Sequence, residues 1–293
     1  YFYECTLEDP GGPWGLEDVV LKFPDGGPDG HKAINLKLHE NQGANNEGSV
    51  FDFESTIVKL MQYDQEQLEL HLLLANLPAP MAPSLRWIGL YTDDPVLCYD
   101  GARVNDQCMA VCMDRVDTSL EEYVLENRED NPNRIFEALR YLCEALTELQ
   151  RRYQFMHNDL QCRNVMIHKK GQVLLIDLEH AIDENIRTRR INEPRSHERF
   201  FNDELLFNAY ADTSRLLEDL NEKTFLGDGQ MGRWDDFLTH SLQARPQKRT
   251  PHWLLKQLDY HTKSAGADRR SRKKLATAPY KRWSHNTTGT SYR

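Results

Sequence analysis

Apolar residues in the first 115 positions of the chain form short runs, which glycine- and proline-rich segments separate. Short apolar runs between turn-forming residues are typical of β-strands. One longer stretch, residues 49–64, has apolar residues at helical spacing and predicts a helix over Phe53, Ile57, Leu60 and Met61. Strands are predicted at residues 1–7, 18–23, 33–38, 84–91 and 107–113.

The pattern changes to a helical period after residue 115. Residues 133–153 place an apolar stripe on one face of a long helix, formed by Ile135, Leu139, Leu142, Leu146 and Leu149. Strands followed by helices are typical of an α+β protein. We therefore predict a two-lobed fold with a small β-rich lobe at residues 1–115, a large helical lobe at residues 116–261, and a basic tail at residues 262–293.

The segment "MHNDLQCRNVMIHKKGQVLLIDLEHA", residues 156–181, combines apolar runs with acidic and amide side chains. Burying such polar groups without partners costs several kcal/mol, so they are candidates for function. Asn164 lies five residues after Asp159, and Asp177 follows Asn164 by thirteen. This segment resembles the catalytic region of the protein kinase superfamily, which reads HRDLxxxxN and places a metal-binding Asp after a short hairpin.

The resemblance implies a phosphotransferase that uses ATP and Mg²⁺. In such enzymes, positioning and charge neutralisation supply most of the catalysis. Asn164 and Asp177 correspond to the two oxygen ligands of Mg²⁺, which prefers carboxylate and amide oxygens. Asp159 corresponds to the base that accepts or orients the acceptor hydroxyl.

Flanking residues extend the resemblance. "MDRVDTSLEEYV" is similar to the kinase hinge, which implies that Met113, Asp114 and Val116 surround the adenine. Arg163 is available for a phosphate, and Asp212 resembles the Asp that braces the catalytic loop from the start of a helix.

The small lobe should also supply a Lys for the α and β phosphates, paired with a Glu on the following helix. Glu54 is the candidate for the Glu. Lys22 is favoured for the Lys, because "VVLKF" matches the VAIK pattern, and Lys37 is the alternative. If Lys37 has this role, "EDPGGPWG" with Gly11, Gly12 and Gly15 becomes the candidate phosphate loop.

Three interpretations of function remain open. The first is an atypical protein kinase, with Ser or Thr favoured as acceptor. The second is a small-molecule kinase, because "HNDLQ" and "IDLE" also resemble choline kinase and aminoglycoside phosphotransferase relatives. The third is a pseudokinase, a binding module without catalysis. Asn158 replaces the Arg of HRD and Glu179 replaces the Gly of DFG, so the segment departs from the usual pattern.

Charge and cysteine content add predictions about partners and compartment. The chain has a formal net charge of −10, yet residues 262–293 are strongly basic, so this tail is a candidate contact for nucleic acid or another acidic partner. The six cysteines show no CxxC pair and are interpreted as reduced core thiols of an intracellular protein, cytoplasmic or nuclear. No run approaches the roughly 18 apolar residues of a membrane span.

Overall fold

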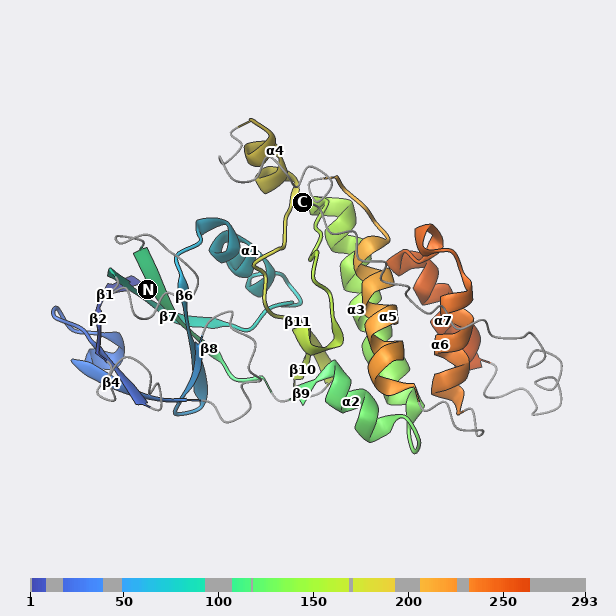
Figure 1. Cartoon of the computed structure of the whole chain (residues 1–293), viewed down its shortest axis with the longest axis horizontal. Helices are drawn as coiled ribbons and strands as arrows, with labels where there is room; N and C mark the ends of the chain where they lie inside the picture. The colour runs from blue at the N-terminus through green and yellow to red at the C-terminus, as the bar shows by residue number, and fades with distance from the viewer. Residues whose placement is uncertain are drawn as a thin grey trace, which may run out of the picture.

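The computed structural model describes residues 2–8, 18–38, 49–92, 107–116, 118–168, 171–192, 206–225 and 232–263. Within these ranges the chain forms an eight-stranded sheet, a three-stranded sheet and seven α-helices. Figure 1 places the large sheet at one end of the molecule and most of the helices at the other. The chain is therefore a mixed α+β protein, in agreement with the predicted fold class.

The large sheet has the strand order β1-β7-β8-β6-β5-β4-β3-β2. Only the β1–β7 pair is parallel, and the other pairs described within this sheet are antiparallel. The small sheet has the order β11-β10-β9. The strand bounds are β1 (Phe2–Glu4), β2 (Thr6–Glu8), β3 (Asp18–Lys22), β4 (Ala33–Leu38), β5 (Ser49–Phe53), β6 (Thr56–Gln62), β7 (Leu85–Thr92), β8 (Gln107–Asp114), β9 (Thr118–Ser119), β10 (Val165–His168) and β11 (Gln172–Leu175).

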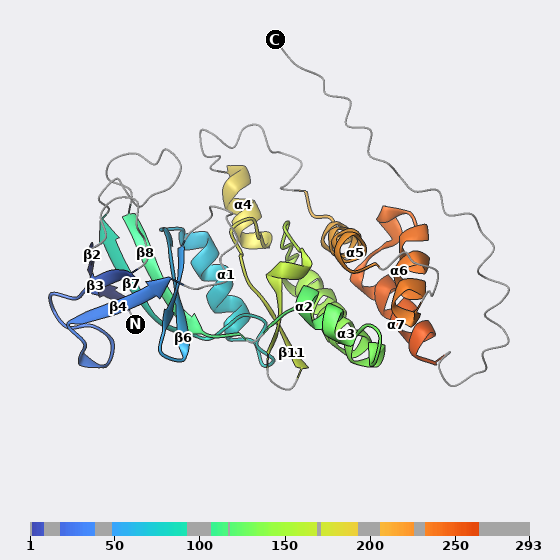
Figure 2. The same ribbon diagram turned by 60° about the horizontal axis from the view of Figure 1, so that its bottom comes forward.

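One helix, α1, lies between the large sheet and the small one, and α4 stands beside it (Figures 1 and 2). The other five pack together at the far end. None of the helices described is both long enough and apolar enough to cross a membrane. The helix bounds are α1 (Gln65–Ala75), α2 (Leu120–Asn127), α3 (Pro132–Tyr153), α4 (Glu184–Asn192), α5 (Ala211–Thr224), α6 (Arg233–Gln243) and α7 (Pro251–Lys263).

The helix predicted at residues 49–64 is wrong. These residues form the hairpin of β5 and β6, whose register pairs Phe53 with Thr56. Glu54 stands at the tip with a positive φ of 51°, and the Thr56 hydroxyl donates to the Phe53 carbonyl oxygen at 2.7 Å. The helix begins one residue later, at α1, where the Asp64 carboxylate accepts from the backbone N–H groups of Glu66 and Gln67 and so caps it.

The neighbouring strands β6 and β8 divide their side chains between the two faces of the sheet, because successive strand residues point to opposite sides. On one face, Val58, Leu60, Ala110 and Cys112 pack into a core with Trp87, and on the other the alternate residues of β6 and β8 face α1. This second face carries Ile57, Lys59, Met61, Met109, Val111 and Met113.

The helical part is built around α3, which buries the predicted stripe of Ile135, Leu139, Leu142, Leu146 and Leu149 in a core shared with α2, α5, α6 and α7. The five described cysteines are buried and free of disulfides. Cys98, the glycine-rich "EDPGGPWG" from Asp9 on, and the tail from residue 264 on lie outside the described residues.

Candidate functional site

A cavity of about 280 Å³ lies between the second face of the large sheet, α1 and the loop that follows α3. Its wall is apolar over most of its extent, and its charged and amide groups come from different elements. Its lining residues include Val50, Ile57, Met61, Leu68, Met109, Val111, Met113, Val116 and Ile176 among the apolar ones, and Lys59, Gln67, His71, Arg163, Asn164 and Asp177 among the polar ones.

Asp212, at the start of α5, anchors the loop after α3 through hydrogen bonds to the loop backbone. The Asp212 carboxylate accepts from the backbone N–H groups of His157 at 2.8 Å and Asn158 at 2.9 Å. Complete burial raises the pKa of Asp212, whereas the two N–H donors and the nearby Arg215 act in the opposite direction. These bonds fix the backbone at Asn158, which has the unusual φ of 61°. Asp212 therefore has the bracing place that the sequence predicted for it.

The carboxylate of Asp159 is fixed on several sides. The Asn164 side-chain amide donates to the Asp159 carboxylate and to its carbonyl oxygen, each at 3.0 Å. Gln161 donates to the other carboxylate oxygen at 2.8 Å, and the guanidinium of Arg215 forms an ion pair with that same oxygen. Arg215 also donates to the Asn158 carbonyl oxygen at 3.1 Å. The Asp159 side chain is thus buried, and these contacts fix the orientation of its carboxylate.

Asp177 lies two residues after the end of β11, lines the cavity and has a positive φ of 60°. Its carboxylate pairs with the ammonium of Lys59 at 3.1 Å, and both side chains are about four-fifths buried. The backbone before Asp177 is fixed because the Ile176 N–H donates to the Asn164 carbonyl oxygen at 3.0 Å and the Ile176 carbonyl oxygen lies 3.0 Å from Nε2 of His157. Asn164 and Asp177 thus reach one cavity from different segments.

The α1 side of the cavity presents uncharged polar groups. Gln67 and His71, one helical turn apart, both line it. The His71 ring lies 2.7 Å from the Pro83 carbonyl oxygen through Nε2, which must be the donor because a carbonyl only accepts. Burial lowers the pKa of His71, and the charge of Lys59 lowers it further.

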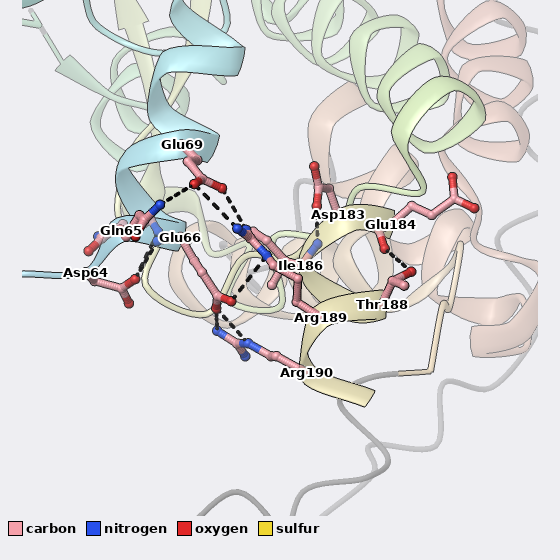
Figure 3. Close-up of polar contacts among 11 residues, drawn as sticks. Asp64, Gln65, Glu66, Glu69, Asp183, Glu184, Ile186, Thr188, Arg189 and Arg190 are labelled. Atoms are coloured by element: carbon pink, nitrogen blue, oxygen red, sulfur yellow. Dashed lines mark hydrogen bonds and ion pairs between the residues drawn. The ribbon is translucent and has the colours of Figure 1, made fainter. Parts of the chain in front are cut away.

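The carboxylates of α1 are turned toward α4 instead (Figure 3). Arg190 donates to Glu66 at 2.8 Å, and Arg189 pairs with Glu69 at 2.7 Å. The charged edge of α1 therefore binds the helix that follows Asp177 in sequence, while its other face lines the cavity.

The structure does not bring Lys22, Lys37 or Glu54 to Asp177. Lys22 lies on β3, three strands from β6 in sheet order, where it is half exposed and pairs with Glu8 at 2.6 Å. Lys37 is exposed on β4. Glu54 is exposed at the hairpin tip, not on a helix. The physical reason for the correction is the strand order, which places β6 next to Asp177, so that Lys59 and not Lys22 lies beside that carboxylate.

The other predicted residues divide as follows. Met113, Val116 and Arg163 line the cavity together with Asn164 and Asp177. Asp159 adjoins it through Asn164. Asp114 is turned away, because its carboxylate pairs with Arg86 at 2.5 Å and its N–H donates to the Ser84 carbonyl oxygen.

Four residues of the site were not found from the sequence: Lys59, Gln67, His71 and Arg215. The signal for Lys59 was present. "TIVKL" places Lys59 directly after three β-branched residues and matches VAIK as well as "VVLKF" does. The helical interpretation of residues 49–64 concealed it. Arg215 had no such signal, because its contact with Asp159 joins residues 56 positions apart.

The donor set fits a Mg²⁺ ion together with nucleotide phosphates. Asn164 uses its amide nitrogen for both bonds to Asp159, so its oxygen is the atom that Asp159 does not engage. A carboxylate and an amide oxygen, completed by phosphate and water, suit Mg²⁺, which is seldom held by a cage of protein ligands alone. The described residues contain no cluster of three or more His, Cys, Asp or Glu side chains that could hold a metal by themselves.

Comparison with known proteins agrees with this geometry. No curated protein sequence shows a significant match to the chain. A family model described as "Haspin like kinase domain" matches residues 52–238, nearly two thirds of the sequence. The match includes strand β6 with Lys59, the loop of Asp159 and Asn164, and the whole of α5. The chain therefore belongs to the haspin-like kinase family, an atypical protein-kinase-like family.

Proposed function

We propose that the chain is an active protein kinase, which transfers the γ-phosphoryl group of ATP to a hydroxyl group of a protein, with Ser or Thr favoured. The observation that carries the proposal is the meeting of Lys59, Asn164 and Asp177 at one end of an apolar cavity. Family membership alone supports a kinase-like phosphotransferase, and the site residues support the finer assignment.

The apolar part of the cavity suits a flat base, because Val50, Val111 and Met113 supply contact surface without charge. In this arrangement the sheet with α1 forms a nucleotide-binding small lobe, residues 1–115, and residues 116–261 form the large lobe. The phosphates then extend toward Lys59, whose ammonium compensates their charge.

The chemical step needs little covalent assistance from the protein. Asp159 accepts the hydrogen bond of the acceptor hydroxyl and takes its proton as the oxygen–phosphorus bond forms and the bond between the γ-phosphorus and the β,γ-bridging oxygen breaks. Asn164 and Asp177 would hold Mg²⁺, which when bound neutralises phosphate charge. Because Asn164 also donates to Asp159, the metal-binding residues and the base share one hydrogen-bonded unit.

The test is a transfer assay with the purified chain, radiolabelled ATP and Mg²⁺. Generic protein acceptors are offered in one reaction, and choline or an aminoglycoside in another, with Asp159→Asn as the inactive control. Label in protein that depends on Asp159 supports the proposal. Label in the small molecules alone would assign the chain to the small-molecule kinases, and nucleotide binding without transfer to either class would assign it to the pseudokinases.

A further inference from the structure

Among the residues that the structure describes, Lys59 has one anionic partner, and that partner is a proposed metal ligand. The ammonium lies 3.1 Å from Asp177. If Asp177 binds Mg²⁺ with nucleotide, its carboxylate becomes shared with a divalent cation, and Lys59 must turn toward the phosphates. A cation that changes partners needs a second group to hold its new position, because an unpaired buried charge is costly.

The carboxylates of α1 do not supply that group. Glu66 and Glu69 belong to the edge of α1 that pairs with Arg190 and Arg189 of α4, as Figure 3 shows. Glu66 and Arg190 are 12% and 18% exposed, so this contact is well shielded from solvent. Within the described chain, the two carboxylates of α1 therefore form ion pairs with α4.

Gln67 lines the same cavity as Lys59. It lies on the cavity-facing side of α1, and only 9% of its surface is exposed. Its side-chain oxygen is buried and has no hydrogen-bond partner among the described residues. Buried acceptors without a partner are rare in proteins, and a cavity that also contains an ammonium group offers the missing donor.

We propose that Gln67 is the positioning residue of Lys59 in the nucleotide-bound state. Its amide oxygen accepts a hydrogen bond from the Lys59 ammonium once Asp177 binds the metal. An uncharged acceptor on α1 thus pairs with the lysine, the role that the sequence analysis assigned to Glu54. The neighbouring His71 is bonded to Pro83 and carries no negative charge, which leaves Gln67 as the unpartnered acceptor of this face. This inference rests on the proposed function, because it assumes that Lys59 contacts nucleotide phosphates.

The test measures the dissociation constant of Mg²⁺–ADP and of Mg²⁺–ATP for the full chain. Gln67→Met keeps the size of the side chain and removes the acceptor, and about tenfold weaker binding is expected, as for loss of one charge-assisted hydrogen bond. Gln67→Glu restores an acceptor and should bind at least as tightly as the wild type. Gln65→Leu is the matched control, since Gln65 is exposed on the same helix and should bind normally.

A double-mutant cycle with Lys59→Met separates a contact with Lys59 from a general role in packing. If Gln67 acts through Lys59, Gln67→Met should have no further effect in the Lys59→Met background. Normal nucleotide binding by Gln67→Met would overturn the inference. So would a double variant whose increase in the dissociation constant equals the product of the increases in the two single variants. Should Gln67→Met prove unstable on heating, Gln67→Glu decides alone, because weaker binding by this variant would contradict the proposed contact.

The failure of this inference is distinguishable from a failure of the proposed function. If the wild type binds no Mg²⁺–nucleotide, or binds it equally well after Lys59→Met, the nucleotide site itself is refuted. If wild-type binding depends on Lys59 but not on Gln67, only the role of Gln67 is refuted.

Discussion

The wall of the cavity formed by the loop after α3 and the wall formed by the large sheet differ in how their polar groups are satisfied. On the loop side, Asp159 is held by Asn164, Gln161 and Arg215, and Asp212 fixes the backbone beneath. On the sheet side, Lys59 has one described ion pair, and Gln67 of the adjoining α1 has a buried oxygen without a described partner.

Under the proposed function, this difference gives the two walls different parts in phosphoryl transfer. The loop wall is preorganised, so its groups have little rearrangement to make when substrate binds. Under the proposed function, a bound nucleotide would provide the partners that the groups of the sheet wall and α1 lack. Substitutions on the loop wall should therefore change turnover, and those on the sheet wall should first change nucleotide affinity.

The largest expected effect is that of Asp159→Asn. Removal of a general base typically lowers the rate by about 10²- to 10⁴-fold, so transfer to protein should fall within that range. The Mg²⁺–ADP dissociation constant should stay within about twofold, because Asp159 adjoins the cavity without lining it. Asp130→Asn, in an exposed turn before α3, is the control. A large loss of nucleotide affinity in Asp159→Asn would remove the contrast between the two walls.

The next largest effect compares two lysines of the sheet. Lys59→Met should weaken Mg²⁺–ADP binding by at least about tenfold and reduce transfer further, because it removes a shielded cation from the phosphate end. Lys22→Met should leave both within about twofold, since an exposed ion pair contributes little. Binding titrations and transfer rates on the two variants check this. If Lys22→Met lost more nucleotide affinity and more transfer activity than Lys59→Met, Lys22 would be the lysine that contacts the phosphates.

A smaller effect is expected for Arg215 on the loop wall. Arg215→Met should lower kcat by about tenfold with unchanged nucleotide affinity, because the half-exposed guanidinium orients Asp159. Arg215→Lys should recover only part of the rate, since a single ammonium does not reproduce a fork that reaches both Asp159 and the Asn158 carbonyl. If Arg215→Met weakens nucleotide binding with normal kcat, Arg215 does not act through Asp159.

The smallest effect concerns the two contacts between α1 and α4. A double-mutant cycle on Glu66 and Arg190 should give a coupling energy of about 1 kcal/mol in the free energy of unfolding. The same cycle on Glu69 and Arg189, which are nearly half exposed, should give less than about 0.5 kcal/mol. Chemical denaturation of the single and double variants provides the values. Equal coupling in both cycles would show that shielding from solvent does not distinguish the pairs.

The loop wall and the sheet wall also differ in how far the sequence predicted their residues. Asp159, Asn164 and Asp177 lie within one short segment, so their residue types and their spacing along the chain could be recognised as a motif. The long helix α3 and most strands were likewise visible in the local apolar pattern.

Lys59 and its partners depended on contacts that no local pattern contains. The hairpin of β5 and β6 has apolar residues that satisfy both a helical and a strand period, and its true period appears only when Val58 and Leu60 are seen to face the core. Which lysine faces Asp177 is decided by strand order, a non-local property of the sheet. The Arg215–Asp159 pair is long-range in the same sense.

The central claim is that Asp177 joins the two walls through Mg²⁺ and nucleotide. Calorimetric titration of ADP into the wild type and Asp177→Asn, each with Mg²⁺ and with a chelator, tests it most directly. Mg²⁺ should tighten binding to the wild type by at least about tenfold and should have no effect on Asp177→Asn, because the substituted side chain loses the charge that binds the cation. An equal effect of Mg²⁺ on both proteins, or none on the wild type, would contradict the account.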